Sequence, residues 1–147
     1  MKAMCSDIVR TEWLYGEGSK SVTSKRSFVD IMLDMAEKKS VINGIVDELG
    51  RPTYTGDLAQ AVFTMVEQKK PFGIYHITNS GIASRYSWAK EIFKIKNTNP
   101  ELVEVNSSFF KRKAKRPRYE ILNNTKLIKL RSWNEAFKRI SNQIRTT

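Results

Sequence analysis

Residues 46–62, "VDELGRPTYTGDLAQAV", change character twice over a short distance. An apolar run passes into two acidic residues, and Gly50 and Pro52 then supply turn chemistry before a helical pattern begins. That pattern repeats apolar residues at helical spacing: Leu58, Ala61, Val62, Met65 and Val66. Asp57 falls in the first turn of the predicted helix, where the helix dipole favours a negative charge. Loops of this build often carry binding residues, so this loop is the first candidate for a site.

Strand and helix signals alternate on both sides of this loop. Residues 7–15, "DIVRTEWLY", predict a strand that ends in a glycine-rich turn, and residues 41–46 predict an extended segment. Downstream, "FGIYHIT" at 72–78 and "LVEV" at 102–105 also predict strands. This alternation favours an α/β fold over a helical bundle or a β-sandwich.

Serine residues mark the expected starts of three further helices: Ser27, Ser84 and Ser132. An acidic residue three positions later, Asp30 or Glu135, completes a capping box at the first and the last of them. The first helix has apolar residues at Phe28, Ile31, Met32, Met35 and Ala36. The second is expected to run to Lys96, and the last contains Trp133, Ala136, Phe137, Ile140 and Ile144.

Length and composition indicate one folded domain over residues 1–147, because the chain is long enough to bury a core and is 40% hydrophobic. Cys5 is the single cysteine, so no internal disulfide is expected, and a reducing compartment is the simplest setting. We find no apolar run of membrane-spanning length and no signal-peptide pattern. These features predict a cytoplasmic protein. The formal charge of +11 suits an anionic partner.

Three short motifs suggest chemistry that the surrounding sequence does not support. Tyr86 and Lys90 fit a Tyr-x-x-x-Lys pair, in which the lysine lowers the pKa of the tyrosine, but so short a pattern is not specific. "GEGSKS" at 16–21 lacks the glycine spacing of a phosphate loop or a dinucleotide fingerprint. His76 has no second histidine to join it, and a structural role is favoured. No metal site is expected.

The segment "KRKAKRPR", residues 111–118, is the main rival signal because six of its eight residues are basic. Such a run can bind nucleic acid. No recognised nucleic-acid-binding motif or stacking pattern surrounds it, and a solvated loop is the simpler interpretation.

Four segments in order then show a family resemblance: "VRTEWLYGEG" (9–18), "DELGRPTYTGDLA" (47–59), "GIYHITNSGIASRYSWAKEIF" (73–93), and "AKRPRYEILNNTKL" (114–127) with "SWNEAF" (132–137). They resemble the C-terminal, substrate-binding part of dTDP-4-dehydrorhamnose reductase, an extended short-chain dehydrogenase/reductase. Their shared order over almost the whole chain makes the match more specific than any single motif.

The resemblance implies an α/β substrate-binding part that retains one strand of the dinucleotide-binding sheet. The family reduces dTDP-4-dehydro-6-deoxy-L-mannose with NADPH to make dTDP-L-rhamnose. Its glycine-rich NADPH loop and its Tyr-x-x-x-Lys helix would lie upstream of Met1, so we expect no catalytic residue and no NADPH site in this chain. The chain alone would then be inactive and would bind a dTDP-sugar. It would work with a separately encoded N-terminal half or as a homodimer.

The resemblance also assigns site residues and exposes differences. Trp13 matches the aromatic residue placed against the sugar, Arg116 matches a position suited to the pyrophosphate, and Thr53 and Tyr54 end the loop over the site. Three residues differ from the family pattern: Ser27 replaces an asparagine, Glu48 replaces a glutamine, which puts a negative charge near an anionic ligand, and Arg85 replaces a tryptophan. The alternatives are a non-catalytic regulatory or interaction subunit and, less favoured, a basic nucleic-acid-binding protein.

Overall fold

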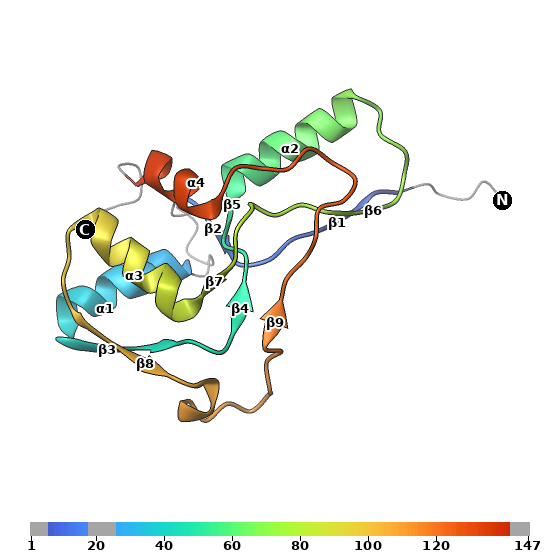
Figure 1. Cartoon of the computed structure of the whole chain (residues 1–147). Helices are drawn as coiled ribbons and strands as arrows, with labels where there is room; N and C mark the ends of the chain where they lie inside the picture. Colours follow the sequence, from blue (N-terminus) through green and yellow to red (C-terminus); the bar gives the residue numbers. More distant parts are fainter. Residues whose placement is uncertain (1–5, 18–25, 142–147) are drawn as a thin grey trace.

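Helices and short strands alternate along the chain in the computed structural model, which describes residues 6–17 and 26–141 (Figure 1). The helices are α1 (Phe28–Lys38), α2 (Thr55–Glu67), α3 (Arg85–Lys96) and α4 (Trp133–Ile140), with a single 3-10 turn at Ser107–Phe109. The strands are β1 (Ile8–Arg10), β2 (Leu14–Tyr15), β3 (Val41–Ile45), β4 (Leu49–Gly50), β5 (Thr53–Tyr54), β6 (Ile74–His76), β7 (Ala83–Ser84), β8 (Glu101–Val105) and β9 (Tyr119–Glu120). The predicted α/β class is confirmed.

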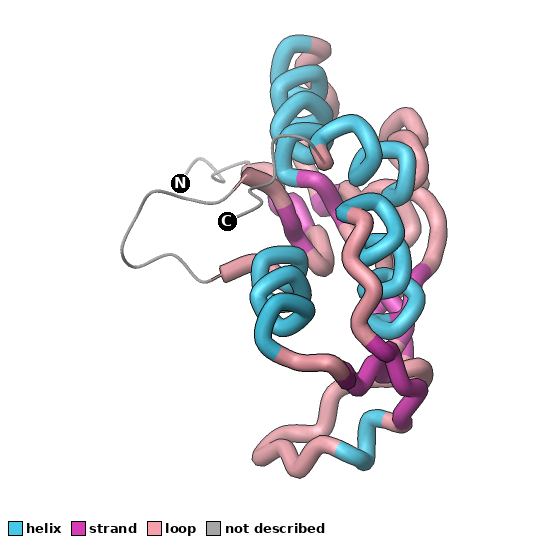
Figure 2. The backbone as a smooth tube through the Cα atoms, turned by 90° about the vertical axis from the view of Figure 1, so that its left-hand side faces the viewer, coloured by secondary structure: helices cyan, strands magenta, loops and turns pink. Residues whose placement is uncertain are grey.

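The strands pair in small groups. Parallel pairs join β1 to β6, β2 to β5 and β3 to β8, and β4 lies between β7 and β9. Figure 2 shows these strands as short segments set between helices and long loops. The β3–β8 ladder has five register pairs, and each of the other ladders has two or three.

The strand predicted over residues 7–15 is divided in two by the structure. Trp13 takes a left-handed backbone conformation with φ 42°, which turns the chain between β1 and β2. Because of this turn, β1 pairs with β6 while β2 pairs with β5. One segment thus contributes to two different parts of the fold.

The predicted helix caps are confirmed. Ser27 accepts a hydrogen bond from the backbone N–H of Asp30 at 3.2 Å, and the Asp30 carboxylate accepts one from the N–H of Ser27 at 3.0 Å. Ser84 caps α3, and Ser132 begins α4 in a capping box with Glu135. Ile144, expected in the last helix, lies outside the described residues, as do Cys5 and most of the predicted loop over 19–27.

Two apolar cores support the fold. The larger core packs α1, α3 and α4 around the buried side chains of Tyr15, Trp88 and Phe137. The smaller core packs α2 onto β1 and β6 through Met65, Tyr75 and Ile77. In Figure 1, α2 lies apart from α1 and α3, above the paired strands β1 and β6. Among the described helices, none has the length and apolar character needed to cross a bilayer.

Candidate functional site

Trp13 is fixed by contacts that reach across the chain. Its carbonyl accepts a hydrogen bond from the N–H of Thr53 at 3.0 Å, and its indole Nε1 donates to the carboxylate of Glu120. Gly50 packs directly against the ring, because a Cβ at that position would lie 2.5 Å from Trp13 Cε2. The glycine of the "DELGRP" loop is therefore required for the close approach of Trp13.

Arg85 lies over the face of Trp13. Its guanidinium carbon is 3.7 Å from the Trp13 ring centroid and 5.1 Å from that of Phe28. Trp13 and Trp88 stack with their rings 5.9 Å apart and 10° from parallel. The aromatic surface expected to meet a sugar is therefore shared with a cation, in the geometry of a cation–π contact.

Asp47 and Glu48 contact the basic segment, residues 111–118, and the turn just before it. Asp47 accepts hydrogen bonds from Ser107, 2.6 Å from its backbone N–H and 3.0 Å from its hydroxyl. Glu48, which is 5% exposed, pairs with Arg112. The sequence predicted that the charge of Glu48 would disturb an anionic ligand. That charge is offset by the guanidinium of Arg112.

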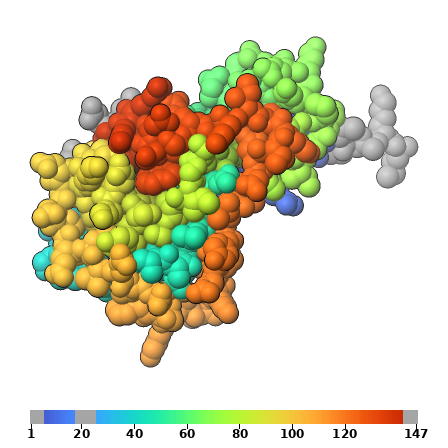
Figure 3. Space-filling view, viewed as in Figure 1, coloured from blue at the N-terminus to red at the C-terminus, as the bar shows by residue number. Residues whose placement is uncertain are grey.

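The basic segment, residues 111–118, is exposed along its whole length. The chain around it, orange in Figure 3, projects at the lower edge of the molecule in that view. Arg118 is 3.9 Å from the Asp47 carboxylate. Arg116 makes no hydrogen bond or ion pair within residues 6–17 and 26–141, but its positive charge acts on Arg85. Burial, followed by this repulsion, lowers the pKa of Arg85 to about 10.

Thr53 and Tyr54 are placed differently from each other. Thr53 is fully buried, and its hydroxyl donates to the carbonyl of Arg51 at 3.0 Å. Tyr54 is half-buried, its ring lies 6.0 Å from that of Tyr15, and its side chain lines a cavity beside α2. Among the predicted site residues, Trp13 and Thr53 are therefore joined by a backbone hydrogen bond. The charge of Arg116 acts on Arg85, which lies over Trp13. Tyr54 faces a separate cavity.

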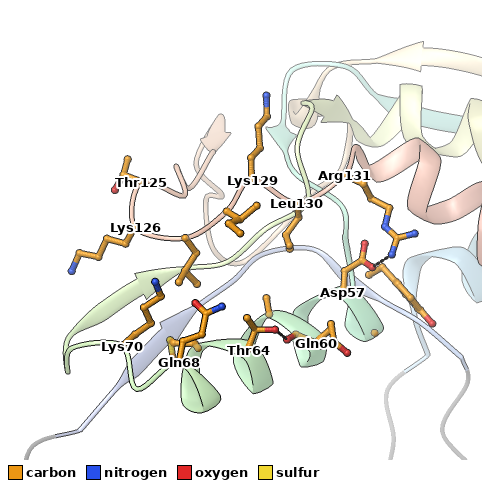
Figure 4. Close-up of a pocket in the computed structure, with 16 residues that line it drawn as sticks. Asp57, Gln60, Thr64, Gln68, Lys70, Thr125, Lys126, Lys129, Leu130 and Arg131 are labelled. Atoms are coloured by element: carbon orange, nitrogen blue, oxygen red, sulfur yellow. Dashed lines mark hydrogen bonds and ion pairs between the residues drawn. The ribbon is translucent and has the colours of Figure 1, made fainter.

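The cavity beside α2 has a volume of about 910 Å³ and lies between this helix and residues 125–131 (Figure 4). Asp57 lines this cavity, and its buried carboxylate accepts hydrogen bonds from Arg131 and from Asn79, each at 2.7 Å. Asn79 in turn accepts the backbone N–H of Tyr54 at 2.8 Å. This network connects the end of the 46–57 loop to Asn79 and to Arg131, which lie far along the chain.

A second carboxylate, Glu12, stabilises the same loop. It accepts hydrogen bonds from the backbone N–H groups of Arg51 at 3.1 Å and Leu122 at 2.9 Å. Burial raises the pKa of Glu12 above its usual value, although both hydrogen bonds oppose that shift. Sequence reasoning did not identify Glu12 or Asn79, because each acts only through long-range partners.

Tyr86 and Lys90 lie on one face of α3, with the Lys90 ammonium 6.0 Å from the tyrosine ring centroid. They line another cavity, of about 670 Å³, whose lining does not include Trp13 or Arg85. His76 ends β6 and is half-buried. In the described part of the chain, no cluster of three or more histidine, cysteine, aspartate or glutamate residues could hold a metal ion.

Comparison with known proteins gives a match over residues 2–146 to the family described as the RmlD substrate binding domain. The chain belongs to this family. A spore coat polysaccharide biosynthesis protein, SpsK, of Bacillus subtilis is 36% identical over 137 residues, covering 90% of this chain and 46% of the relative. The dTDP-4-dehydrorhamnose reductase of Mycolicibacterium smegmatis is also 36% identical, covering 89% of this chain and 40% of the relative.

Solved structures agree with this family membership. The dTDP-4-dehydrorhamnose reductase of Clostridium acetobutylicum superposes with a TM-score of 0.82 at 34% identity, covering 92% of this chain and 47% of that one. The Bacillus anthracis reductase, solved in complex with NADP, has the same TM-score at 29% identity and covers 92% and 48%. The chain therefore has the fold of the matched part of these reductases and spans about half of their length.

Proposed function

We propose that this chain is the sugar-nucleotide-binding portion of a dTDP-4-dehydrorhamnose reductase-like protein. The single observation that carries the proposal is the match over residues 2–146 to the RmlD substrate binding domain. The ligand is a dTDP-sugar, and the intact protein reduces dTDP-4-dehydro-6-deoxy-L-mannose with NADPH. The chain contributes the surface that holds the sugar nucleotide rather than the group that transfers the hydride.

Each proposed ligand-binding residue has a distinct role. Trp13 forms an aromatic wall against the sugar, and Arg116, whose guanidinium has no other described partner, binds the diphosphate. Thr53 acts through its backbone N–H, which positions Trp13. Tyr54 ends the loop: its backbone is anchored by Asn79, and its side chain lines the cavity beside α2.

Reduction requires an NADPH-binding half, which docks on the β1–β6 sheet. Within the described residues this sheet has two strands, so β1 has one unpaired edge. Ile8 and Ile74 are register partners on the face away from α2, and each remains more than 40% exposed. An unpaired strand edge beside exposed isoleucines recruits another protein segment. This half is carried either by a separate protein or elsewhere in the same protein.

The same exposed face supports one alternative, a non-catalytic interaction subunit or a homodimer. In that case the β1 edge pairs with a regulatory partner or with a second copy, and no hydride transfer follows. Binding to nucleic acid is less favoured, because Arg112 and Arg118 of the basic segment already face Glu48 and Asp47.

The proposal is tested by mixing this chain with the NADP-binding half of the Bacillus anthracis reductase. We expect the chain alone to leave NADPH absorbance unchanged with dTDP-4-dehydro-6-deoxy-L-mannose, and the co-eluting mixture to consume NADPH. Turnover by the chain alone would show that no second half is needed. A complex that binds both ligands without turnover would instead establish the non-catalytic alternative, and failure to co-elute would remove the docking face.

A further inference from the structure

Arg85 is the most unusual group at the site, because a half-buried guanidinium covers the aromatic wall. Its carbon lies 3.7 Å from the Trp13 centroid, 5.1 Å from that of Phe28 and 5.6 Å from that of Trp88. All three rings lie within the range at which an aromatic face attracts a cation. They cannot accept the in-plane hydrogen bonds of its N–H groups.

No protein acceptor satisfies those donors in the part of the chain that the structure describes. The two carboxylates whose charges act on Arg85 are Glu120 and Glu48, and each already has a different donor. Glu120 accepts from the indole of Trp13, and Glu48 pairs with Arg112. The Arg85 nitrogens are not among the buried atoms that lack a partner, so solvent reaches these donors and they are open to an acceptor from a ligand.

The local charge is positive and therefore suits an anion. Arg116 and Arg112 both repel the charge of Arg85, and burial together with this repulsion lowers its pKa against the opposing effect of the two carboxylates. Three guanidinium groups and two carboxylates thus act on one another here, and one of the three, Arg112, is already paired with Glu48. The planar fork of an arginine matches two oxygens of one carboxylate or phosphoryl group.

We propose that Arg85 binds an oxyanion of the sugar nucleotide directly and so determines which ligands the Trp13 wall accepts. The geometry leaves the Trp13 face shared with Arg85, so a wholly neutral sugar meets N–H donors there as well as an aromatic ring. The oxyanion comes either from the diphosphate or from a carboxylate on the sugar. This inference rests on the proposed sugar-nucleotide function and assigns a further specificity residue to that site.

The experiment compares Arg85→Gln and Arg85→Lys with Lys94→Gln. Lys94 lies near the other end of α3 and is exposed, so its variant removes the same charge from the same helix away from the site. Affinities are measured by calorimetry and tryptophan fluorescence for inorganic pyrophosphate, dTDP, dTDP-rhamnose and dTDP-glucuronate. Thermal unfolding checks that each variant is folded.

Arg85→Gln should weaken binding about tenfold or more, Arg85→Lys should recover part of the loss, and Lys94→Gln should bind like the unmodified chain. A loss for every probe identifies the diphosphate as the source, and a loss confined to dTDP-glucuronate identifies a sugar carboxylate. Equal affinities of Arg85→Gln and Lys94→Gln for every probe would overturn the assignment. If Arg85→Gln does not fold, an Arg85→Lys variant that binds every probe like the unmodified chain overturns it.

The same titrations separate this inference from the proposed function. Pyrophosphate binding could depend on Arg85 while dTDP binds no more tightly than pyrophosphate. That result would keep Arg85 as an anion-binding residue and would contradict the sugar-nucleotide function. If none of the probes binds at millimolar concentration, both the Arg85 assignment and the sugar-nucleotide function are contradicted.

Discussion

At the scale of single residues, the site depends on close packing around Trp13. Its positive φ, its Nε1 contact to Glu120 and the adjacent Gly50 all serve one ring orientation. The family resemblance identified Trp13 and the turn chemistry identified Gly50, but neither showed that the two residues touch. The contact to Glu120 spans 107 positions, and no local pattern reports a partner at that distance.

Gly50→Ala should disturb this ring. A Cβ would lie 2.5 Å from Trp13 Cε2, so the ring or the loop must shift. Overpacking of this kind costs about 1–3 kcal/mol of unfolding free energy. Urea unfolding followed by tryptophan fluorescence measures the cost. Gly73→Ala is the matched control, because its Cβ would meet only Lys126 Nζ at 3.5 Å, and equal losses for the two variants would contradict the packing argument.

At the scale of elements, local signals predicted the helices well and the strands less well. The caps at Ser27 and Ser132 and the apolar spacing of α1 and α2 are short-range features, and the structure confirms them. The division of residues 7–15 into β1 and β2 was not predicted, because it follows from pairing with β6 and β5 far along the chain. Arg85 was noticed as a difference from the family, but its place over Trp13 depends on how α3 packs.

Asp57→Ala should loosen α2 from the rest of the fold. The change leaves Asn79 and Arg131 without their shared acceptor, each now 2.7 Å from the Asp57 carboxylate. Loss of a buried hydrogen-bond partner costs about 1–3 kcal/mol. Denaturant unfolding provides the measurement, and Asp34→Ala, at an exposed i, i+4 ion pair with Lys38, is the control. A midpoint for Asp57→Ala that matches the control would show that the network does not anchor α2.

At the scale of the whole molecule, the acidic loop and the basic segment form one unit. Asp47 and Glu48 hold residues 107–118 beside β4 and β9, and this brings the charge of Arg116 to Arg85 and Trp13. Among the residues that the structure describes, the β1–β6 sheet has two strands, an unpaired edge and two exposed isoleucines, Ile8 and Ile74. We therefore propose separate faces of the molecule for the ligand and for a partner.

The most direct measurement of the central claim is calorimetric titration of this chain with dTDP-rhamnose at fixed salt, together with Arg116→Ala and Lys113→Ala. Both variants remove one exposed positive charge from the same segment. We expect binding by the unmodified chain and a loss of about 1.5–3 kcal/mol for Arg116→Ala, because a charge-assisted contact to the diphosphate disappears. Lys113→Ala should lose less, about 0.2–1 kcal/mol, since it acts only through solvent. Equal losses for the two variants would remove Arg116 from the site, and no binding by the unmodified chain would contradict the claim that it holds a sugar nucleotide.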